Sequence, residues 1–409
     1  MKRIFLVFLL FLMASFLFSK SFFSERYFEV KTVVPASVST NSIGVVNFFQ
    51  KEVVIDFSKI AERMPENGLD LSLFASPKVE TTVNIPNVLK IGPRVGMDVF
   101  GEMNLSKSLF DFIGNGNTIN EPTNVSATAG MDLFYFYGLF VEAKVHKLTV
   151  GFTPNLFVPL LSMSLKDMSF SLNNTEDGKF ILNGTGAVQI YSNADFSNGF
   201  EQGMDNILDN MQNGFGFDLN GCVGWDFTND FTLSLNYKVP IVPGRYKVLS
   251  SYNVDFENEF SLLDMQEDKE VIETDEESMK KEKDFSPVIQ EIDYKIYRPM
   301  KFNLGINYNP FGHFFSLSAF AGVGIQHPFM EDFVVYPEYY CNLKVSLIGL
   351  LSAQFSTEYI DRVFAHSFIA SLNLRLIQFD AGVSFSSINF VKSFTGSGVG
   401  AFVAVSVGF

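Results

Sequence analysis

The sequence is poor in the residues that most enzymes and disulfide-rich secreted domains need. Its 409 residues include two cysteines, four histidines and one tryptophan. Two cysteines are too few for a disulfide framework in an exported chain, and no two histidines have the spacing of metal ligands. We therefore expect no metal, no cofactor and no catalytic residue, and we do not expect an enzyme.

The sequence offers one candidate Ser–His–Asp arrangement, made of Asp361, His366 and Ser367. Adjacent residues of a strand point to opposite faces of a sheet. His366 and Ser367 would therefore face away from each other, which argues against a hydrolase.

Long apolar runs and basic charge are also missing. After the amino terminus, no stretch reaches the roughly 18 apolar residues that a membrane-spanning helix needs, although 47% of the chain is hydrophobic and 15% is aromatic. The formal net charge is −15, and residues 255–298 carry much of the acidic excess. Nucleic acid is not an expected partner, because phosphates require a basic surface.

The amino terminus has the pattern of a secretory signal peptide. Lys2 and Arg3 supply positive charge, residues 4–18 are apolar, and small residues at Ser19 and Ser21 suit a nearby cleavage. The apolar run is shorter than a membrane-spanning helix usually is. We assign residues 1–21 to a signal peptide and expect an exported chain; an uncleaved membrane anchor is the alternative.

What the chain does contain is a period-2 alternation of apolar and polar residues, which is typical of strands with two different faces. In residues 231–237, Phe231, Leu233 and Leu235 share one face, while threonine, serine and asparagine take the other. Residues 301–308 and 366–376 alternate in the same way. The polar faces carry Asn, Ser, Gly, Lys and Arg, which suits a polar lumen better than the core of a soluble sandwich.

The lengths of the connections point to a particular kind of barrel. Many of the expected strands are long enough to cross a bilayer at a tilt. In the carboxy-terminal half, short turns, one of them expected near 377–378, alternate with longer connections at 239–299, 325–337, 360–365 and 386–397. This is the outer-membrane pattern, in which the long loops lie outside. The sequence predicts an all-β fold, a transmembrane antiparallel β-barrel of about 14 strands (12–16), with short helices in loops.

Some segments depart from the strand pattern. Residues 58–64 and 201–213 have helical spacing, and residues 264–284 form a charged run that we expect to be a solvated loop. After the signal peptide we distinguish two parts of the chain. They are an N-terminal segment that could act as a hatch or lumen plug (22–68) and the outer-membrane β-barrel (69–409), with an acidic loop at 253–299.

Strand parity assigns individual side chains to a face. Cys222 is expected to point to the lumen and Cys341 to the lipid, so the two thiols should both be free. Aromatic clusters near the strand ends are expected to form girdles at the membrane interfaces. The candidate polar residues of the lumen, which could set selectivity or simply satisfy one another, are Lys301, Asn303, Asn307, Asn373 and Arg375.

The final residues, 398–409, resemble the terminal strand of bacterial outer-membrane proteins. Apolar residues at every second position lead to a terminal aromatic, and those on one face are Val403, Val405, Val407 and Phe409. In those families the strand is a recognition signal for the barrel assembly machinery. The resemblance implies this machinery and outer-membrane lipid as partners, and the cell outer membrane as the location. It leaves the oligomeric state open.

A broader resemblance covers the carboxy-terminal half. Residues 237–244 (YKVPIVPG), 298–305 (RPMKFNLG) and 308–311 (YNPF) resemble uncharacterised outer-membrane proteins of spirochaete-type bacteria. Such proteins are distantly similar to the long-chain fatty acid transporters, which have an amino-terminal hatch. This sequence lacks an Asn-Pro-Ala hatch motif near its start.

Together these features predict a channel or transporter for small or hydrophobic solutes across the outer membrane. One alternative is a surface-exposed interaction or adhesion protein that uses the barrel as an anchor, which rests on the segments 192–215 and 253–299. Another is a secreted soluble β protein.

Overall fold

The structure is a computed structural model. It describes residues 26–41, 57–116, 118–176, 179–194, 206, 214–261, 288–311, 314–331, 333–347, 349–394 and 397–409. The expected signal peptide (1–21) and the charged run (264–284) lie outside the described residues, as does the expected helix at 201–213 apart from Asn206.

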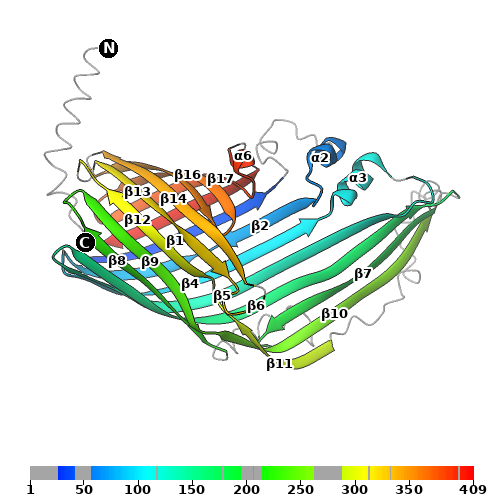
Figure 1. Cartoon of the computed structure of the whole chain (residues 1–409), viewed down its shortest axis with the longest axis horizontal. Helices are drawn as coiled ribbons and strands as arrows, with labels where there is room; N and C mark the ends of the chain where they lie inside the picture. Colours follow the sequence, from blue (N-terminus) through cyan, green and yellow to red (C-terminus); the bar gives the residue numbers. More distant parts are fainter. Residues whose placement is uncertain are drawn as a thin grey trace, which may run out of the picture.

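Among the described residues, eighteen strand segments form a single antiparallel sheet, and three short helices accompany it (Figure 1). The strands of the amino-terminal half are β1 (Phe28–Thr40), β2 (Leu69–Ala75), β3 (Lys78–Ile85), β4 (Leu89–Leu105), β5 (Thr123–Val145), β6 (Leu148–Asn174) and β7 (Lys179–Ser192). Those that follow are β8 (Gly216–Asp226), β9 (Phe231–Val242), β10 (Gly244–Ser261), β11 (Val288–Ile296), β12 (Met300–Tyr308), β13 (Phe315–Gln326), β14 (Val334–Leu347), β15 (Leu351–Ile360), β16 (Val363–Asn373), β17 (Ile377–Ser387) and β18 (Gly398–Gly408). The helices are α2 (Phe57–Arg63), α3 (Lys107–Asn115) and α6 (Phe390–Ser393).

The sheet closes on itself because its first and last strands pair. β1 runs antiparallel to β18, with Glu29 opposite Gly408 and Val38 opposite Val399. At the seam the backbone N–H groups of Tyr27 and Phe28 donate to the carbonyl oxygen of Phe409, at 2.7 and 3.2 Å. The expected all-β, closed antiparallel barrel is therefore confirmed, and closure removes the unpaired sheet edges that would otherwise face lipid.

Several positions of the wall hold two successive segments instead of one strand. β2 and β3 both pair with β1 and with β4, and β7 and β8 both pair with β6. β9 and β10 follow each other along β8 and β7. The barrel has 16 strands, more than the about 14 predicted from sequence and at the upper end of the predicted range of 12–16, and the interruptions raise the number of strand segments to eighteen.

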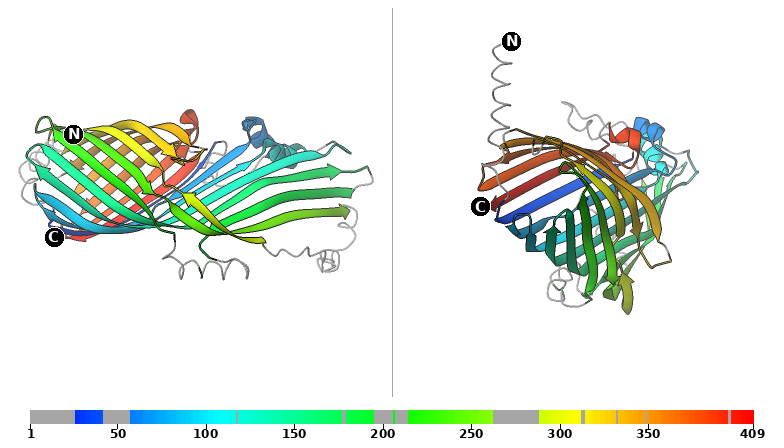
Figure 2. Two further views of the ribbon diagram at one scale, coloured as in Figure 1. Left: turned by 60° about the horizontal axis from the view of Figure 1, so that its bottom comes forward. Right: turned by 60° about the vertical axis from the view of Figure 1, so that its left-hand side comes forward.

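The two sides of the barrel differ in length. β5 and β6 contain 23 and 27 residues, whereas β12 contains 9. About 9–11 residues suffice to cross a bilayer, so the outer parts of β5, β6, β7 and β10 run well past the short strands. Figure 2 shows this part, which we call the extension, projecting as a curved sheet to one side of the closed barrel.

Three expected boundaries are corrected. The barrel wall begins at β1 and not at residue 69, so residues 28–40 are part of the wall and not of a hatch or plug. The expected loop at 253–299 instead contains the end of β10, to Ser261, and all of β11. The turn expected near 377–378 lies at Leu374–Leu376, before β17. A short helix near 58–64 is confirmed as α2, while α3 was not expected.

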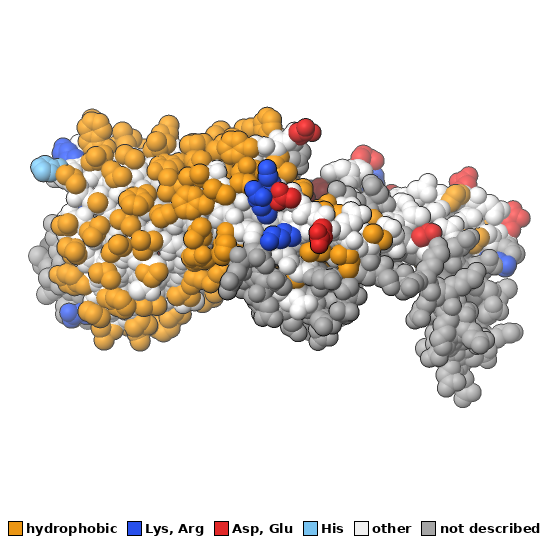
Figure 3. All heavy atoms as spheres, turned by 90° about the horizontal axis from the view of Figure 1, so that it is seen from below, with side chains coloured by type: hydrophobic (Ala, Val, Ile, Leu, Met, Phe, Trp, Pro, Cys, Tyr) orange, Lys and Arg blue, Asp and Glu red, His pale blue; other side chains and the backbone are white. Residues whose placement is uncertain are grey.

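The two faces of the strands separate as their alternation predicts. On β12, Leu304 is 69% exposed, and on β18 Val403 and Val407 are each more than half exposed while Ala404 and Ser406 are buried. Figure 3 shows apolar side chains spread over the outside of the barrel and charged ones nearer the extension. An apolar outer surface around a polar interior is what lipid requires of a barrel. In the described part of the chain, no helix is long and apolar enough to cross a membrane.

Candidate functional site

The lumen contains a buried charged network centred on Arg298, which lies just before β12. Its guanidinium contacts the carboxylate of Asp98 on β4 and, at 2.8 Å, Oδ2 of Asp218 on β8. Ser76 donates its hydroxyl to Asp98 at 2.7 Å. Arg298 and both aspartates are less than a tenth exposed, so each charge depends on its partners, because isolated charges are costly to bury.

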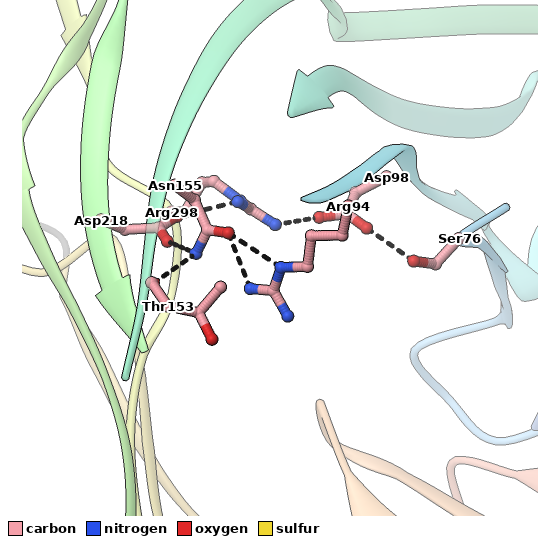
Figure 4. A network of polar contacts seen from close by, with 7 residues as sticks. All are labelled: Ser76, Arg94, Asp98, Thr153, Asn155, Asp218 and Arg298. Carbon is pink, nitrogen blue, oxygen red and sulfur yellow. Dashed lines mark hydrogen bonds and ion pairs between the residues drawn. The ribbon is translucent and has the colours of Figure 1, made fainter. Parts of the chain in front are cut away.

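Asn155 on β6 extends this network to a second arginine. Its Nδ2 donates to Asp218 Oδ1 at 2.6 Å, and its Oδ1 accepts from Nε and Nη2 of Arg94 at 3.0 and 2.7 Å. Figure 4 shows the two arginine side chains between Asp98 and Ser76 on one side and Asn155 and Asp218 on the other. We call these six residues, from Ser76 to Arg298, the Arg298 network.

The Arg298 network joins strands that are not neighbours in the wall. β4 and β12 are separated by β5, β6, β8 and β9. Contact between Asp98 and Arg298 therefore passes through the interior and not along the sheet. The network narrows the lumen at this level and connects strands that are not adjacent in the wall.

Aromatic side chains line the lumen face beside the network. Phe134 lies directly opposite Asp98 in the β4–β5 ladder and shares its face, and its ring is 6.0 Å from that of Phe157. The Arg298 guanidinium lies over the rings of Phe136 and Phe157, at 5.0 and 5.7 Å. We call this cluster the aromatic wall. Its buried members are the aromatic residues Phe134, Phe136, Phe157 and Tyr246 and the aliphatic Ile296.

Two of the lumen candidates from the sequence, Lys301 and Asn303, belong to a second cluster. Lys301 Nζ contacts Glu338 Oε1 and Asp361 Oδ1, both at 2.7 Å. Asn303 donates to Glu338 at 3.3 Å, and the Tyr336 hydroxyl donates to Asp361 at 2.8 Å. These residues contact one another between β12, β14 and the turn after β15, while the buried Oδ1 of Asn303 has no hydrogen-bond partner.

The other three candidates are placed apart from both clusters. Asn307 is half-buried on β12, opposite Thr232 and Ser318. Asn373 ends β16, and its Oδ1 accepts from Arg26 Nη2 at 3.3 Å. Arg375 lies in the turn after β16 with a φ of 71°, and it is exposed at the barrel rim. The five residues therefore form no single site.

The residues of the terminal strand occupy one outward face. Val403, Val405 and Val407 are exposed on β18, and Phe409 follows them with 70% of its surface exposed. The Phe409 ring stacks on Phe28 across the seam, with centroids 5.8 Å apart. Recognition of this face by the barrel assembly machinery remains a prediction.

The cysteines are free, as predicted. Cys222 alternates with the exposed Val223 and Trp225, so it points inward. Cys341 shares its parity with the exposed Leu343 and alternates with the buried Asn342, so it points outward. Opposite faces of a sheet keep the two sulfurs apart.

The structure does not join Asp361, His366 and Ser367 in the hydrogen-bonded arrangement of a Ser–His–Asp site. Asp361 contacts Lys301 and Tyr336, and His366 Nε2 lies 3.0 Å from the hydroxyl of Ser393, not from that of Ser367. Both His366 and Ser393 are buried. No group of three or more His, Cys, Asp or Glu residues in the described ranges could hold a metal ion.

Comparison with known proteins finds distant likeness in solved structures alone. No family model matches, and no curated protein matches. The chain resembles the CymD monoaromatic hydrocarbon channel at 10% identity, covering 97% of this chain and 93% of the other with a TM-score of 0.44. A FadL homologue of Pseudomonas aeruginosa matches at 12% identity, over 94% and 91%, with a TM-score of 0.44.

A third likeness is to the toluene transporter TodX of P. putida, at 9% identity over 94% of this chain and 90% of that one, with a TM-score of 0.42. All three likenesses have a TM-score below 0.5 and a sequence identity of 12% or less. No bacterial lineage is identified, so the resemblance to spirochaete-type proteins is not supported further. Similarity at this level carries no function over to this chain.

Sequence reasoning missed the Arg298 network and the aromatic wall. Asn155 and Asp218 lie on strands with register shifts, Asp98 lies on the regularly paired β4, and Arg298 lies between two strands. A signal was present, because arginine and aspartate at inward positions of a lipid-facing barrel need partners. Which partners they find depends on the closure of the barrel.

Proposed function

We propose that the chain is an outer-membrane channel or transporter for small solutes that carry an apolar ring. The observation that supports this most is the aromatic wall, which places buried phenylalanine rings on the lumen side next to the Arg298 network. A lumen for water and ions alone has no need of such a surface, because porin interiors are polar. The closed barrel with its apolar outside supports the outer membrane as its location.

Planar-bilayer recording on the refolded protein tests this proposal. We expect discrete ionic conductance, and partial block of the current when benzyl alcohol occupies the lumen. Replacing Phe136 by alanine removes a ring from the aromatic wall and should weaken the block by about 2- to 10-fold, given about 0.5–1.5 kcal/mol for an aromatic contact.

Phe379→Ala is the matched control, since Phe379 is exposed on the outside of β17 and should not alter the block. Heat-modified migration on gels confirms that both variants fold. Absence of conductance, or equal block in all three proteins, contradicts the proposal.

A second function is favoured by the extension. Its strands continue past the length that a bilayer requires, so that part of the sheet is available to a partner outside the membrane. A variant lacking residues 169–185 shortens the β6–β7 hairpin beyond the Leu165–Val188 pair. Loss of cell-surface binding with unchanged conductance would favour the interaction protein over the channel.

A further inference from the structure

Two carboxylates lie side by side on the inner face of the sheet, where the extension begins. Asp132 on β5 lies between Phe100 on β4 and Ser162 on β6 in the ladders and accepts a hydrogen bond from the Ser162 side chain. The Glu102 side chain lies over Gly130, because a Cβ added there would be 3.5 Å from its Cγ and Oε1. Gly130 is two residues from Asp132 on the same face, about 7 Å along the strand. Among the described residues, neither carboxylate forms an ion pair.

The other charges of the described lumen do not compensate this pair. Beside it, three cations are matched by three carboxylates, namely Lys78, Arg94 and Arg298 by Glu80, Asp98 and Asp218. Farther along, three more cations are matched in the same way, namely Lys238, Lys301 and Arg362 by Glu338, Glu358 and Asp361. In the described part of the chain, His327 in the turn after β13 is the basic group within electrostatic range of Asp132. Even with His327 charged, the pair keeps an excess of one negative charge (−2 + 1).

Aromatic rings border the two carboxylates. Phe100 lies directly opposite Asp132, and its ring is 6.4 Å from that of Phe134 in the aromatic wall. On the far side of β6, the Tyr191 ring lies 6.4 Å from that of Tyr246. The faces of aromatic rings attract cations. This border therefore suits a positively charged group better than an anion.

The hydroxyl of Tyr246 indicates which kind of cation fits. Tyr246 is fully buried, and its hydroxyl has no hydrogen-bond partner among the described residues. Asp132 is within electrostatic range of that hydroxyl. A buried polar group without a partner is costly, and an N–H donor held between the Tyr246 oxygen and Asp132 relieves this cost. A primary ammonium has three such donors and can meet Tyr246 and both carboxylates at once.

We propose that Asp132, Glu102 and Tyr246 form a binding site for a primary ammonium group attached to an apolar ring. The ammonium lies between the two carboxylates, and the ring lies against Phe100 and Phe134 at the end of the aromatic wall. This inference rests on the proposed channel and adds a positive charge to its substrate class. The net charge of −15 attracts such cations from solution.

Titration calorimetry of the refolded protein in detergent tests the site with benzylammonium and with benzyl alcohol, which has the same ring and no charge. Benzylammonium should bind more tightly, and added salt should weaken its binding alone. Asp132→Asn should weaken benzylammonium binding by roughly 10-fold or more, the scale of a lost charge-assisted hydrogen bond, and leave benzyl alcohol unchanged. Glu102→Gln should act in the same direction to a smaller extent, because Glu102 is exposed and Asp132 is half-buried.

Glu142→Gln is the matched control. Glu142 lies on the same face of β5 as Asp132, toward the other end of the strand, and its carboxylate is 3.9 Å from Nζ of Lys90. The control removes the same charge as Asp132→Asn but should not affect benzylammonium binding. Heat-modified migration on gels confirms that each variant folds.

Tyr246→Phe separates binding from packing. It removes the unpartnered hydroxyl and keeps the ring, so stability to urea should not fall, whereas benzylammonium binding should weaken by about 2- to 10-fold. Equal affinities for the two ligands, or equal effects of Asp132→Asn and Glu142→Gln, would overturn the site. Conductance is measured separately, so a conducting barrel without a preference for benzylammonium rejects the ammonium site and retains the channel.

Discussion

The barrel has a regular side, β12 to β18, and a long side, β4 to β10. The two sides differ in whether side chains alternate between the inner and the outer face without interruption. On the regular side each strand pairs without a register shift in the described ladders. On the long side register shifts occur between β5 and β6, between β6 and β7, and between β8 and β9. Each shift changes which residues face inward.

The two sides also differ in what their side chains form, the apolar outer surface on one and the candidate functional site on the other. The regular side carries the apolar outer surface and the Lys301 cluster, in which Lys301 pairs with two carboxylates. The long side supplies the aromatic wall and most of the Arg298 network. Bulges bend and twist a strand and re-aim its side chains. We infer that the irregular pairing of the long side is what brings distant charges together in the lumen.

The largest effect is expected when Arg298 is replaced by methionine. The buried carboxylates of Asp98 and Asp218 then lose their shared cation, which should cost about 3–5 kcal/mol of folding free energy. Urea unfolding in lipid vesicles measures it. Lys301→Met on the regular side should cost less, because Lys301 and its partner Asp361 are more exposed. Equal losses would remove the distinction between the two clusters.

A smaller effect is expected on the lipid face of the regular side. Leu304→Arg places a charge where the side chain is 69% exposed to the outside, at a cost of roughly 2–4 kcal/mol near the bilayer midplane. Asn307→Arg introduces the same charge on the lumen face of the same strand and should cost under about 1 kcal/mol. The same unfolding measurement compares them, and the reverse order would mean that the faces are misassigned.

The next effect tests close packing on the long side. A Cβ added at Gly92 would lie 1.6 Å from the carbonyl oxygen of Thr81, which is backbone and cannot rotate away. Gly92→Ala should destabilise the barrel by about 1–3 kcal/mol. Gly101→Ala on the same strand meets its nearest atom at 3.4 Å and should change stability by less than about 0.5 kcal/mol. Similar values for the two would show that the β3–β4 contact is looser.

The smallest expected effect concerns the two thiols, one on each side of the barrel, and chemical labelling measures it. Cys341 points outward on the regular side and Cys222 points inward on the long side. A lipid-soluble maleimide should label Cys341 faster, and a charged thiosulfonate should label Cys222 faster. Mass spectrometry of the intact folded protein in vesicles, followed by peptide mapping, identifies the site. Matching rates for both reagents at both cysteines would contradict the assigned faces.

Much of the regular side could be predicted from local pattern. Residues 301–308 alternate strictly, and Leu304 and Asn303 occupy the faces that the alternation predicts. The long side could not be predicted in this way. Leu133 pairs with Leu161 and Phe134 pairs with Pro159, so one extra residue of β6 shifts the parity of all that follow.

The position of β1 shows the same limit. Its residues were expected to precede the barrel, yet they form the seam with β18 and also pair with β2 and β3. Pairing between residues 28–40 and 398–408 spans nearly the whole chain, and no local pattern encodes it. Only closure of the sheet gives β1 its two neighbours.

By itself the sequence determined the kind of molecule: an all-β chain with an apolar and a polar face and two thiols on opposite faces. Those properties follow from composition and period-2 alternation, which act within a single strand. The tertiary structure decided the rest, namely the seam at β1, the split strands and the meeting of Asp98, Asp218 and Arg298. Such contacts depend on register and curvature, which are set only when all strands pair into one closed wall.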